Sequence, residues 1–298
     1  MKRKIVRHGS SSLTVTLPSK WIEKYSINKG DEVNVEESGS NVIISTQKET
    51  ASGKKTINSK DGKFTKNNLS HLYQLGYDEI EIELTDKNTL KEINERLPNC
   101  MGFEIIDQKN NRIYIKSIAT TLDSEFDNML KKSFLVAEEM GKEIINILEN
   151  QNFKKLDEIR ELERLNNKFT DICIRILNKK GYKIPGRTMQ MYEIVKNIER
   201  VADELKYLCD ALKAMKKSDK KTNSLIKESI EYFFMLNKIV YSNDHSLKDE
   251  IYSKRKALIG KLITEMKKNP KDSIVFHYLI NIVQKTYEGF GGYLSLTL

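Results

Sequence analysis

Residues Lys2 to Gly30 read KRKIVRHGSSSLTVTLPSKWIEKYSINKG, and this stretch decides how the chain is organised. A short basic strand leads into a glycine-serine turn, and an alternating strand follows from Leu13 to Leu17. Pro18 then begins a helix, because proline suits a first helical turn, where its missing N–H would have no partner. Asn28 and Gly30 are expected to end that helix.

A second hairpin is predicted directly after this stretch. Val33 and Val35 alternate with polar residues, Ser38-Gly39-Ser40 forms a turn, and Val42-Ile43-Ile44 follows. Four short strands and one short helix in under fifty residues are too little to bury a hydrophobic core. The sequence therefore predicts that this unit pairs with a second copy of itself.

This segment resembles the swapped-hairpin domain of AbrB, MazE and SpoVT-type transcription factors and antitoxins. The matching residues are Arg7, Gly9, Ser12, Leu13, Val15, Leu17, Pro18, Trp21, Gly30, Asp31 and Val33. The resemblance implies that two chains interleave their hairpins into one barrel. It also implies that basic side chains of the first strands and their loop contact DNA.

The charge of the segment supports the same expectation. Its first thirty residues hold seven Lys or Arg residues against one acid, Glu23. A dimer doubles this charge, and a phosphate backbone is its natural partner, although a lysine-rich surface can also simply be solvated. The residues predicted to bind double-stranded DNA are Arg3, Lys4, Arg7, His8, Ser10, Ser11 and Lys20.

Length and composition limit the remaining possibilities. The chain has 298 residues, 31% of them charged, and a net charge of +9, which leaves room for two or three domains. No apolar run is long enough to span a membrane, and no apolar signal core follows the first residues, so we expect a cytoplasmic protein without membrane insertion. Cys100, Cys173 and Cys209 are too scattered for disulfides or zinc and are predicted to be core residues.

The predicted domains are residues 1–47, 55–118 and 119–298, with a polar linker, Gln47 to Lys55, after the hairpins. The second domain is a small α/β module, interpreted as a structural spacer or dimer support. Its expected elements are a helix from an N-cap at Thr65 to near Gly76, a strand from Tyr77 to Leu84, a helix capped by Asp86, and a hairpin of Phe103–Ile106 with Arg112–Ile118.

From Thr120 onward the hydrophobic period is helical, and five breaks delimit six helices that we expect to form a bundle. The breaks fall at 150–152, 181–186, 218–219, 243–244 and 269–270. The third helix carries one apolar stripe, made of Tyr192, Val195, Ile198, Ala202, Leu205, Cys209 and Leu212. Gly289, Gly291 and Gly292 in the last helix favour close helix packing over a kink.

The six helices also look like three helices repeated twice. Lys196-Asn-Ile-Glu199 resembles Lys285-Thr-Tyr-Glu288, 89 positions later, and Glu163 precedes Glu250 by 87. The run from Asn197 to Asp203, NIERVAD, resembles the signature of the PhoU family of phosphate-uptake regulators, whose fold is two tandem three-helix bundles. The predicted fold class is α+β multidomain: a swapped-hairpin barrel, an α/β module and a PhoU-like pair of bundles.

The PhoU resemblance implies a divalent or ferric metal ion in the first bundle. Carboxylates at i and i+4 project from one helix face and can share one cation. The predicted ligands are Glu163, Asn167, Glu199 and Asp203. In the second bundle the equivalent positions are Glu250 with Lys254 and Glu288 with Gly292, where lysine repels a cation and glycine offers no ligand. Alternatively, Glu199 and Asp203 are polar residues at the margin of a packed helix, with Glu199 paired to neighbours such as Arg200 or to Lys196.

Taken together, these features predict a homodimeric, non-enzymatic transcriptional regulator of phosphate uptake or homeostasis that binds DNA. The alternative is a regulator that acts only by contact with a phosphate transporter or a histidine kinase, with its hairpins used for dimerisation. An antitoxin-like module explains the hairpins but leaves the helical bundle unexplained. An enzyme is least expected, because no arrangement of nucleophile, base and oxyanion donors can be assembled.

Overall fold

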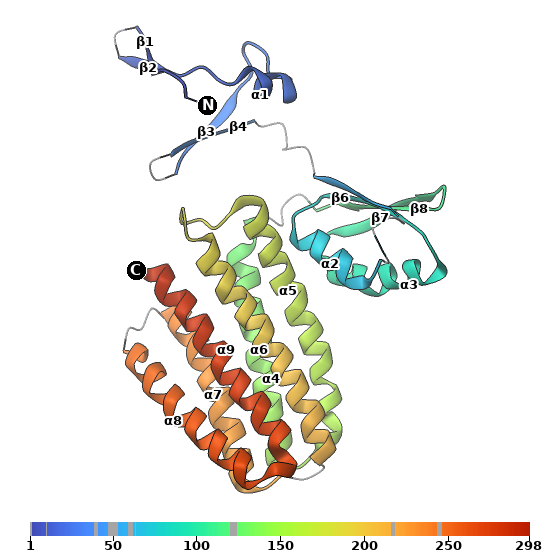
Figure 1. Cartoon of the computed structure of the whole chain (residues 1–298), viewed down its shortest axis with the longest axis vertical. Coiled ribbons are helices and arrows are strands. Elements are labelled where there is room, and N and C mark those ends of the chain that lie inside the picture. Colours follow the sequence, from blue (N-terminus) through green and yellow to red (C-terminus); the bar gives the residue numbers. More distant parts are fainter. Residues whose placement is uncertain are drawn as a thin grey trace. The chain divides into compact units, whose positions relative to one another are not determined.

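The chain is described here by a computed structural model that covers residues 2–9, 11–38, 41–46, 53–58, 62, 64–119, 124–215, 218–242 and 246–298. It divides into two compact units, Met1–Gly53 and Lys54–Leu298. The first unit contains small hairpins, and the second contains a mixed sheet with two helices and a set of long helices (Figure 1). The fold is therefore α+β and multidomain, as predicted.

Two hairpins and one short helix make up the first unit. Its elements are β1 Val6–His8, β2 Ser12–Thr14, α1 Ser19–Lys24, β3 Val33–Ser38 and β4 Asn41–Thr46. Strand β1 pairs antiparallel with β2, and β3 pairs antiparallel with β4, as two separate sheets. The predicted order of strands and helix is confirmed, although β2 ends before the predicted limit at Leu17.

Helix α1 ends one turn earlier than predicted. Ser26 takes a left-handed conformation with φ of 48°. Its N–H donates to the Glu23 carbonyl at 3.2 Å, and the Ile27 N–H donates to the Ile22 carbonyl at 3.0 Å. These two bonds satisfy the carbonyls at the end of a helix. The helix therefore stops at Lys24, and the predicted end at Asn28 and Gly30 is wrong.

The second unit begins with the α/β module. Its elements are β5 Lys54–Ile57, α2 Lys66–Gln74, β6 Glu79–Glu83, α3 Lys87–Arg96, the 3-10 turn η2 Leu97–Asn99, β7 Phe103–Lys109 and β8 Arg112–Ser117. The sheet order is β5-β6-β8-β7, and only β5 with β6 is parallel. Both predicted caps are confirmed, because Thr65 forms a capping box with Asn68, and the Asp86 carboxylate accepts from the Thr89 N–H at 2.7 Å.

Strand β5 was not predicted. Lys54 and Lys55 lie in the segment interpreted as a polar linker, yet Lys54–Ile57 pairs with β6. Two contacts secure the strand: Ile57 packs against the core of the module, and the Lys54 ammonium lies 2.9 Å from the Glu81 carboxylate. Both partners come from the later part of the chain. The local sequence therefore gave no sign of the strand.

Six long helices complete the unit and run side by side (Figure 1). They are α4 Phe126–Glu149, α5 Ile159–Lys180, α6 Thr188–Met215, α7 Lys220–Ser242, α8 Leu247–Lys268 and α9 Ser273–Thr297, with the 3-10 turns η4 Phe153–Asp157 and η5 Pro270–Asp272. Four of the five predicted breaks separate these helices. The fifth, at 243–244, lies outside the described residues.

Helices α6 and α9 pack along each other and join the two groups of three helices (Figure 1). The predicted stripe on α6 is buried from Val195 to Leu212, and only Tyr192 is half-buried. A Cβ atom at Gly289 would lie 2.9 Å from Leu236 Cδ2, and one at Gly292 would lie 3.1 Å from Ile194 Cγ1. These two glycines therefore permit close helix packing, as predicted, whereas Gly291 has no atom within 4 Å of its Cβ position and is not needed for it.

The three cysteines test a further expectation. Cys100, Cys173 and Cys209 are free and buried, which confirms them as core residues. Within the described residues, no helix has both the length and the apolar character needed to cross a membrane.

Helix α4 packs closely against α7 at Gly141, and this contact can be tested by substitution. A Cβ atom at buried Gly141 would lie 2.6 Å from Cγ2 of Ile230, a stiff side chain that is itself fully buried. We expect Gly141→Ala to lower the free energy of unfolding by about 1–3 kcal/mol through overpacking. Exposed Gly260 has no atom within 4 Å of its Cβ position, so Gly260→Ala should add roughly 0.5–1 kcal/mol. Urea unfolding of both variants measures the contrast, and equal effects would contradict this packing.

Candidate functional site

The residues predicted to bind DNA lie on different elements of the first unit. Arg3 and Lys4 precede β1, Arg7 and His8 belong to it, and Lys20 lies in α1. These side chains and that of Ser11 are all exposed to solvent. Ser10, the remaining member of the predicted set, lies outside the described residues.

The β1–β2 hairpin determines which of these side chains share a face. Arg7 lies opposite Leu13, and His8 lies opposite Ser12. Side chains alternate between the two faces of a strand, so Arg7 and His8 project to opposite sides. The hairpin therefore does not bring these two residues together within one chain. Its turn contains Gly9, whose φ of 72° is one that glycine adopts without strain.

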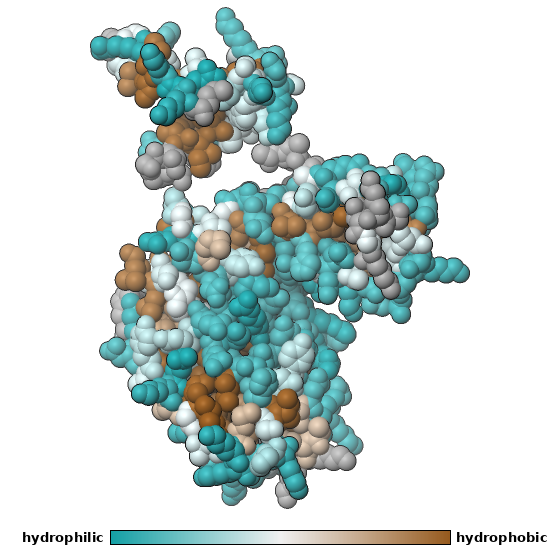
Figure 2. Space-filling model, viewed as in Figure 1, coloured by the Kyte–Doolittle hydropathy of each residue, from teal (hydrophilic) through white to brown (hydrophobic). Residues whose placement is uncertain are grey.

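The first unit has no buried side chain among those whose exposure the structure describes. Its apolar residues are instead largely exposed: Leu13 by 71%, Val35 by 61% and Val42 by 63%. Figure 2 shows brown, hydrophobic surface on this unit. Exposed apolar patches of this kind are typical of surfaces that bind another protein surface.

The predicted metal ligands lie on α5 and α6, and a lysine comes between two of them. The Lys206 ammonium donates to Glu163 Oε1 of α5 and to Asp203 Oδ1 of α6, each at 2.7 Å. Burial lowers the pKa of Lys206, but its hydrogen bonds to the two carboxylates outweigh this and raise that pKa above its usual value. The lysine therefore stays charged between the two acids.

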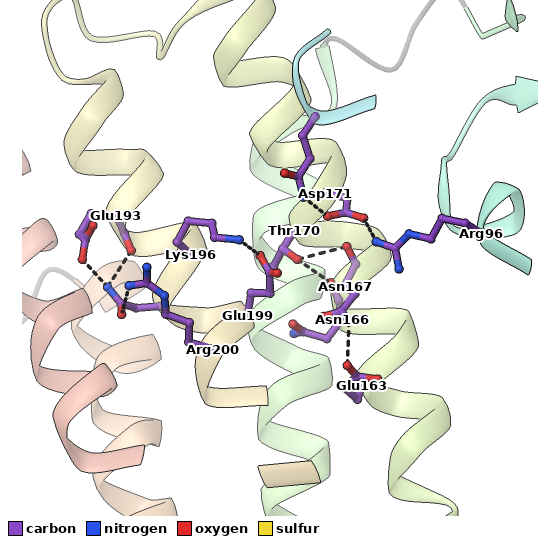
Figure 3. Close-up of polar contacts among 12 residues, drawn as sticks. Arg96, Glu163, Asn166, Asn167, Thr170, Asp171, Glu193, Lys196, Glu199 and Arg200 are labelled. Carbon is purple, nitrogen blue, oxygen red and sulfur yellow. Dashed lines mark hydrogen bonds and ion pairs between the residues drawn. The ribbon is translucent and has the colours of Figure 1, made fainter. Parts of the chain in front are cut away.

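The side-chain amide nitrogen of Asn167 and the carboxylate of Glu199 also have partners, whereas the buried amide oxygen of Asn167 has none. Asn167 donates to Glu163 Oε1 at 2.8 Å, and the Lys196 ammonium donates to Glu199 Oε2 at 2.6 Å (Figure 3). The pairing of Glu199 with Lys196 is the alternative that the sequence left open. The structure thus brings Glu163 and Asp203 to Lys206, with Asn167 bonded to Glu163, while Glu199 pairs with Lys196.

This arrangement does not fit a metal ion. No group of three or more His, Cys, Asp or Glu side chains within the described residues is placed to hold one. A divalent ion about 4 Å from the Lys206 ammonium would be repelled by roughly 8 kcal/mol at an effective dielectric constant of about 20. In the second group of helices, Lys254 lies 2.6 Å from Glu250, and Lys285 lies 3.0 Å from Glu288.

A buried charge network that the sequence reasoning missed joins α5 to the α/β module. Asp171 accepts from Arg96 at 2.8 Å and from Gln74 at 2.6 Å (Figure 3). Arg175 pairs with Asp78 and donates to the Tyr77 carbonyl at 2.7 Å. The available signal was the run DICIRIL at 171–177, in which two charged residues interrupt apolar ones. Charges in such a run need buried partners.

Arg175 also contacts two aromatic rings of the module. Its guanidinium lies 5.0 Å from the ring centroids of Tyr73 and Phe103, and it donates to the Tyr73 carbonyl at 2.9 Å. A guanidinium with aromatic and carbonyl partners is stable without water. Helix α5 therefore contacts α6 along one part of its length and holds the module along another.

Comparison with known proteins identifies two segments. Residues 6–52 match the model of the MazE family, described as antidote-toxin recognition MazE, bacterial antitoxin. Residues 130–212 match the PhoU domain. The chain thus joins a MazE-like segment to a PhoU-like one. The PhoU match covers most of α4, all of α5 and most of α6, and both families are regulatory. No curated protein and no solved structure matches the chain.

The Asp171 carboxyl gives a pH-dependent prediction. Burial raises its pKa to about 6, and the attraction of Arg96 opposes this only in part. The folded pKa exceeds the unfolded one, so the stability that this group contributes is present below about pH 4 and is lost as the pH rises to about 6. We expect the difference in unfolding free energy between the unaltered protein and Asp171→Asn to fall by up to about 3 kcal/mol over this range.

Urea unfolding at pH 4 and pH 7 provides the measurement. The control is Asp210→Asn, at an exposed aspartate that pairs with Arg160 at 2.6 Å. Exposed ion pairs contribute about 0–1 kcal/mol, so this substitution should have a small effect at both pH values. A difference for Asp171→Asn that does not change with pH would contradict the assignment.

Proposed function

We propose that the chain is a dimeric, DNA-binding, non-enzymatic regulator of phosphate uptake that works in the cytoplasm. The observation that carries this proposal is the first unit, which is basic at its start and exposes apolar side chains that a single chain leaves uncovered. The two family matches support it, because the MazE-like segment coincides with this unit and the PhoU-like segment lies in the helices.

Dimerisation follows from the exposed apolar residues. Two isolated two-stranded sheets are marginal in water, and burial of a leucine or valine side chain contributes about 1.5–3 kcal/mol. A second copy of the same unit brings an equal set of apolar side chains. In the proposed dimer the hairpins of both chains interleave and share one core, which removes Leu13, Val35 and Val42 from water.

DNA binding then follows from charge. Pairing doubles the number of basic side chains on the shared surface, and it lets residues that face different ways in one chain lie beside residues of the other. Arg3, Lys4 and Arg7 are proposed to contact phosphates, together with His8, Ser10, Ser11 and Lys20. Contacts of this kind give an affinity that falls steeply with salt concentration.

The helical part is proposed to sense phosphate status or to bind a signalling partner, which the PhoU-like segment supports. The alternative function is regulation by protein contact alone, with a phosphate transporter or a histidine kinase as the partner. In that case the first unit serves only for dimerisation. Both functions require the dimer, so DNA binding is the property that separates them.

Substitution of Leu13 tests the dimer. We expect Leu13→Asp to weaken self-association by about 100-fold or more, because two charges would enter the shared core of each dimer. Met189→Asp is the matched control, since Met189 is 73% exposed on α6 and lies outside the first unit. Light scattering after size-exclusion chromatography should show a dimer for the unaltered protein and for Met189→Asp. A monomeric unaltered protein would overturn the proposal.

Substitution of Arg7 tests DNA binding. We expect Arg7→Ala to remove two phosphate contacts per dimer, to weaken duplex binding about tenfold, and to lower the salt slope by about two. Lys256→Ala, an exposed position on α8, removes one charge and should leave binding unchanged. Gel shifts with genomic fragments at several salt concentrations measure both variants. No shift by the unaltered dimer at low salt favours the contact-only alternative.

A further inference from the structure

Every carboxylate at the predicted metal-binding positions of the first group of helices, and at the equivalent positions of the second group, pairs with a lysine ammonium. Lys206 binds Glu163 and Asp203, and Lys196 binds Glu199. In the second group of helices, the equivalent carboxylates of Glu250 and Glu288 are paired with Lys254 and Lys285. In each case a lysine lies three or four positions from a carboxylate on its own helix.

Lys206 differs from the other three because it links two helices in a largely buried place. Its side chain is 14% exposed, and that of Glu163 is 9% exposed. The ammonium lies 2.7 Å from an oxygen of α5 and 2.7 Å from an oxygen of α6. Oxygen ligands surround calcium at about 2.3–2.6 Å, so the ammonium stands close to where a shared cation would stand.

The Glu163 side chain is buried and that of Asp203 is 34% exposed, and two carboxylates that share one ammonium need a positive charge between them. Without one, their mutual repulsion and their desolvation would oppose the packing of α5 against α6. A metal ion supplies that charge from solution and makes the packing depend on its concentration. A lysine supplies the positive charge from the chain itself, so the charge is present in every molecule and does not depend on the concentration of an ion.

We propose that Lys206 takes the place of a metal ion between α5 and α6. The first three-helix group is then held together without a divalent cation, and Lys206 blocks the position that a cation would occupy. The proposal concerns the residues of this site alone, and it holds whether or not the first unit binds DNA.

The proposal predicts that removing the ammonium creates a cation site. Lys206→Met keeps a long side chain and leaves Glu163 and Asp203 without the ammonium that they share. With EDTA this variant should have a lower melting temperature than the unaltered protein, and millimolar Mn²⁺ should raise its melting temperature by about 5 °C. The unaltered protein should show the same melting temperature in EDTA and in Mn²⁺, and no Mn²⁺ binding by electron paramagnetic resonance.

Two controls locate the effect. Lys206→Met combined with Glu163→Gln removes a carboxylate of the new site and should lose the response to Mn²⁺. Lys254→Met removes the lysine of the Glu250 pair, whose side chains are 55% and 44% exposed, and should show no response. A response in either control would overturn the assignment to Lys206.

The unaltered protein decides the proposal even if Lys206→Met does not fold. Stoichiometric binding of Mn²⁺ at micromolar concentration by the unaltered protein, with a rise in its melting temperature, would overturn the proposal. The lack of such binding, together with a melting temperature that EDTA leaves unchanged, supports it. A folded Lys206→Met variant that ignores Mn²⁺ would also overturn it.

Discussion

Among the side chains of the first unit whose exposure the structure describes, none is buried, and several apolar ones face water. Two separate two-stranded sheets and a six-residue helix leave Leu13, Val35 and Val42 in contact with water in a single chain. The hydrophobic effect favours an arrangement that removes them from it. Pairing with a second chain would satisfy this requirement and would concentrate basic side chains on one surface, so one cause would serve both dimerisation and DNA binding.

Helix α5 connects two parts of the second unit, because its charged side chains pair with α6 and with the α/β module. Glu163 meets Lys206 of α6, and two turns or more along the same helix Asp171 and Arg175 meet the α/β module. The charged partners are largely buried, and breaking such pairs costs more than breaking exposed ones. The α/β module is therefore packed against α5, the same helix that carries Glu163 of the carboxylate site.

The carboxylate site lies within the segment that matches the PhoU domain, residues 130–212, which also contains the NIERVAD run. At the position between α5 and α6, however, an ammonium accompanies the acids. Apolar stripes and tight glycine contacts stabilise the helices, so a substitution at the polar margin can alter cation binding without altering the packing.

Sequence alone determined the features that depend on neighbours along the chain. Thr65 and Asp86 cap helices where predicted, and the breaks near Gly181 and Pro270 fall between long helices, because capping and helix termination are local. The residue pattern also indicated the first unit's strands. Family resemblance, rather than spacing, supplied the expectation of a metal site.

Only the tertiary structure decided which distant residues meet. Strand β5 forms because β6 pairs with it, Arg175 is stable because Asp78 lies beside it, and Lys206 lies between Glu163 and Asp203 because α5 packs against α6. Glu163 and Lys206 are 43 positions apart, and no periodicity links them. Such pairs are set by packing of whole elements, so their chemistry appears only once the helices and strands are in place.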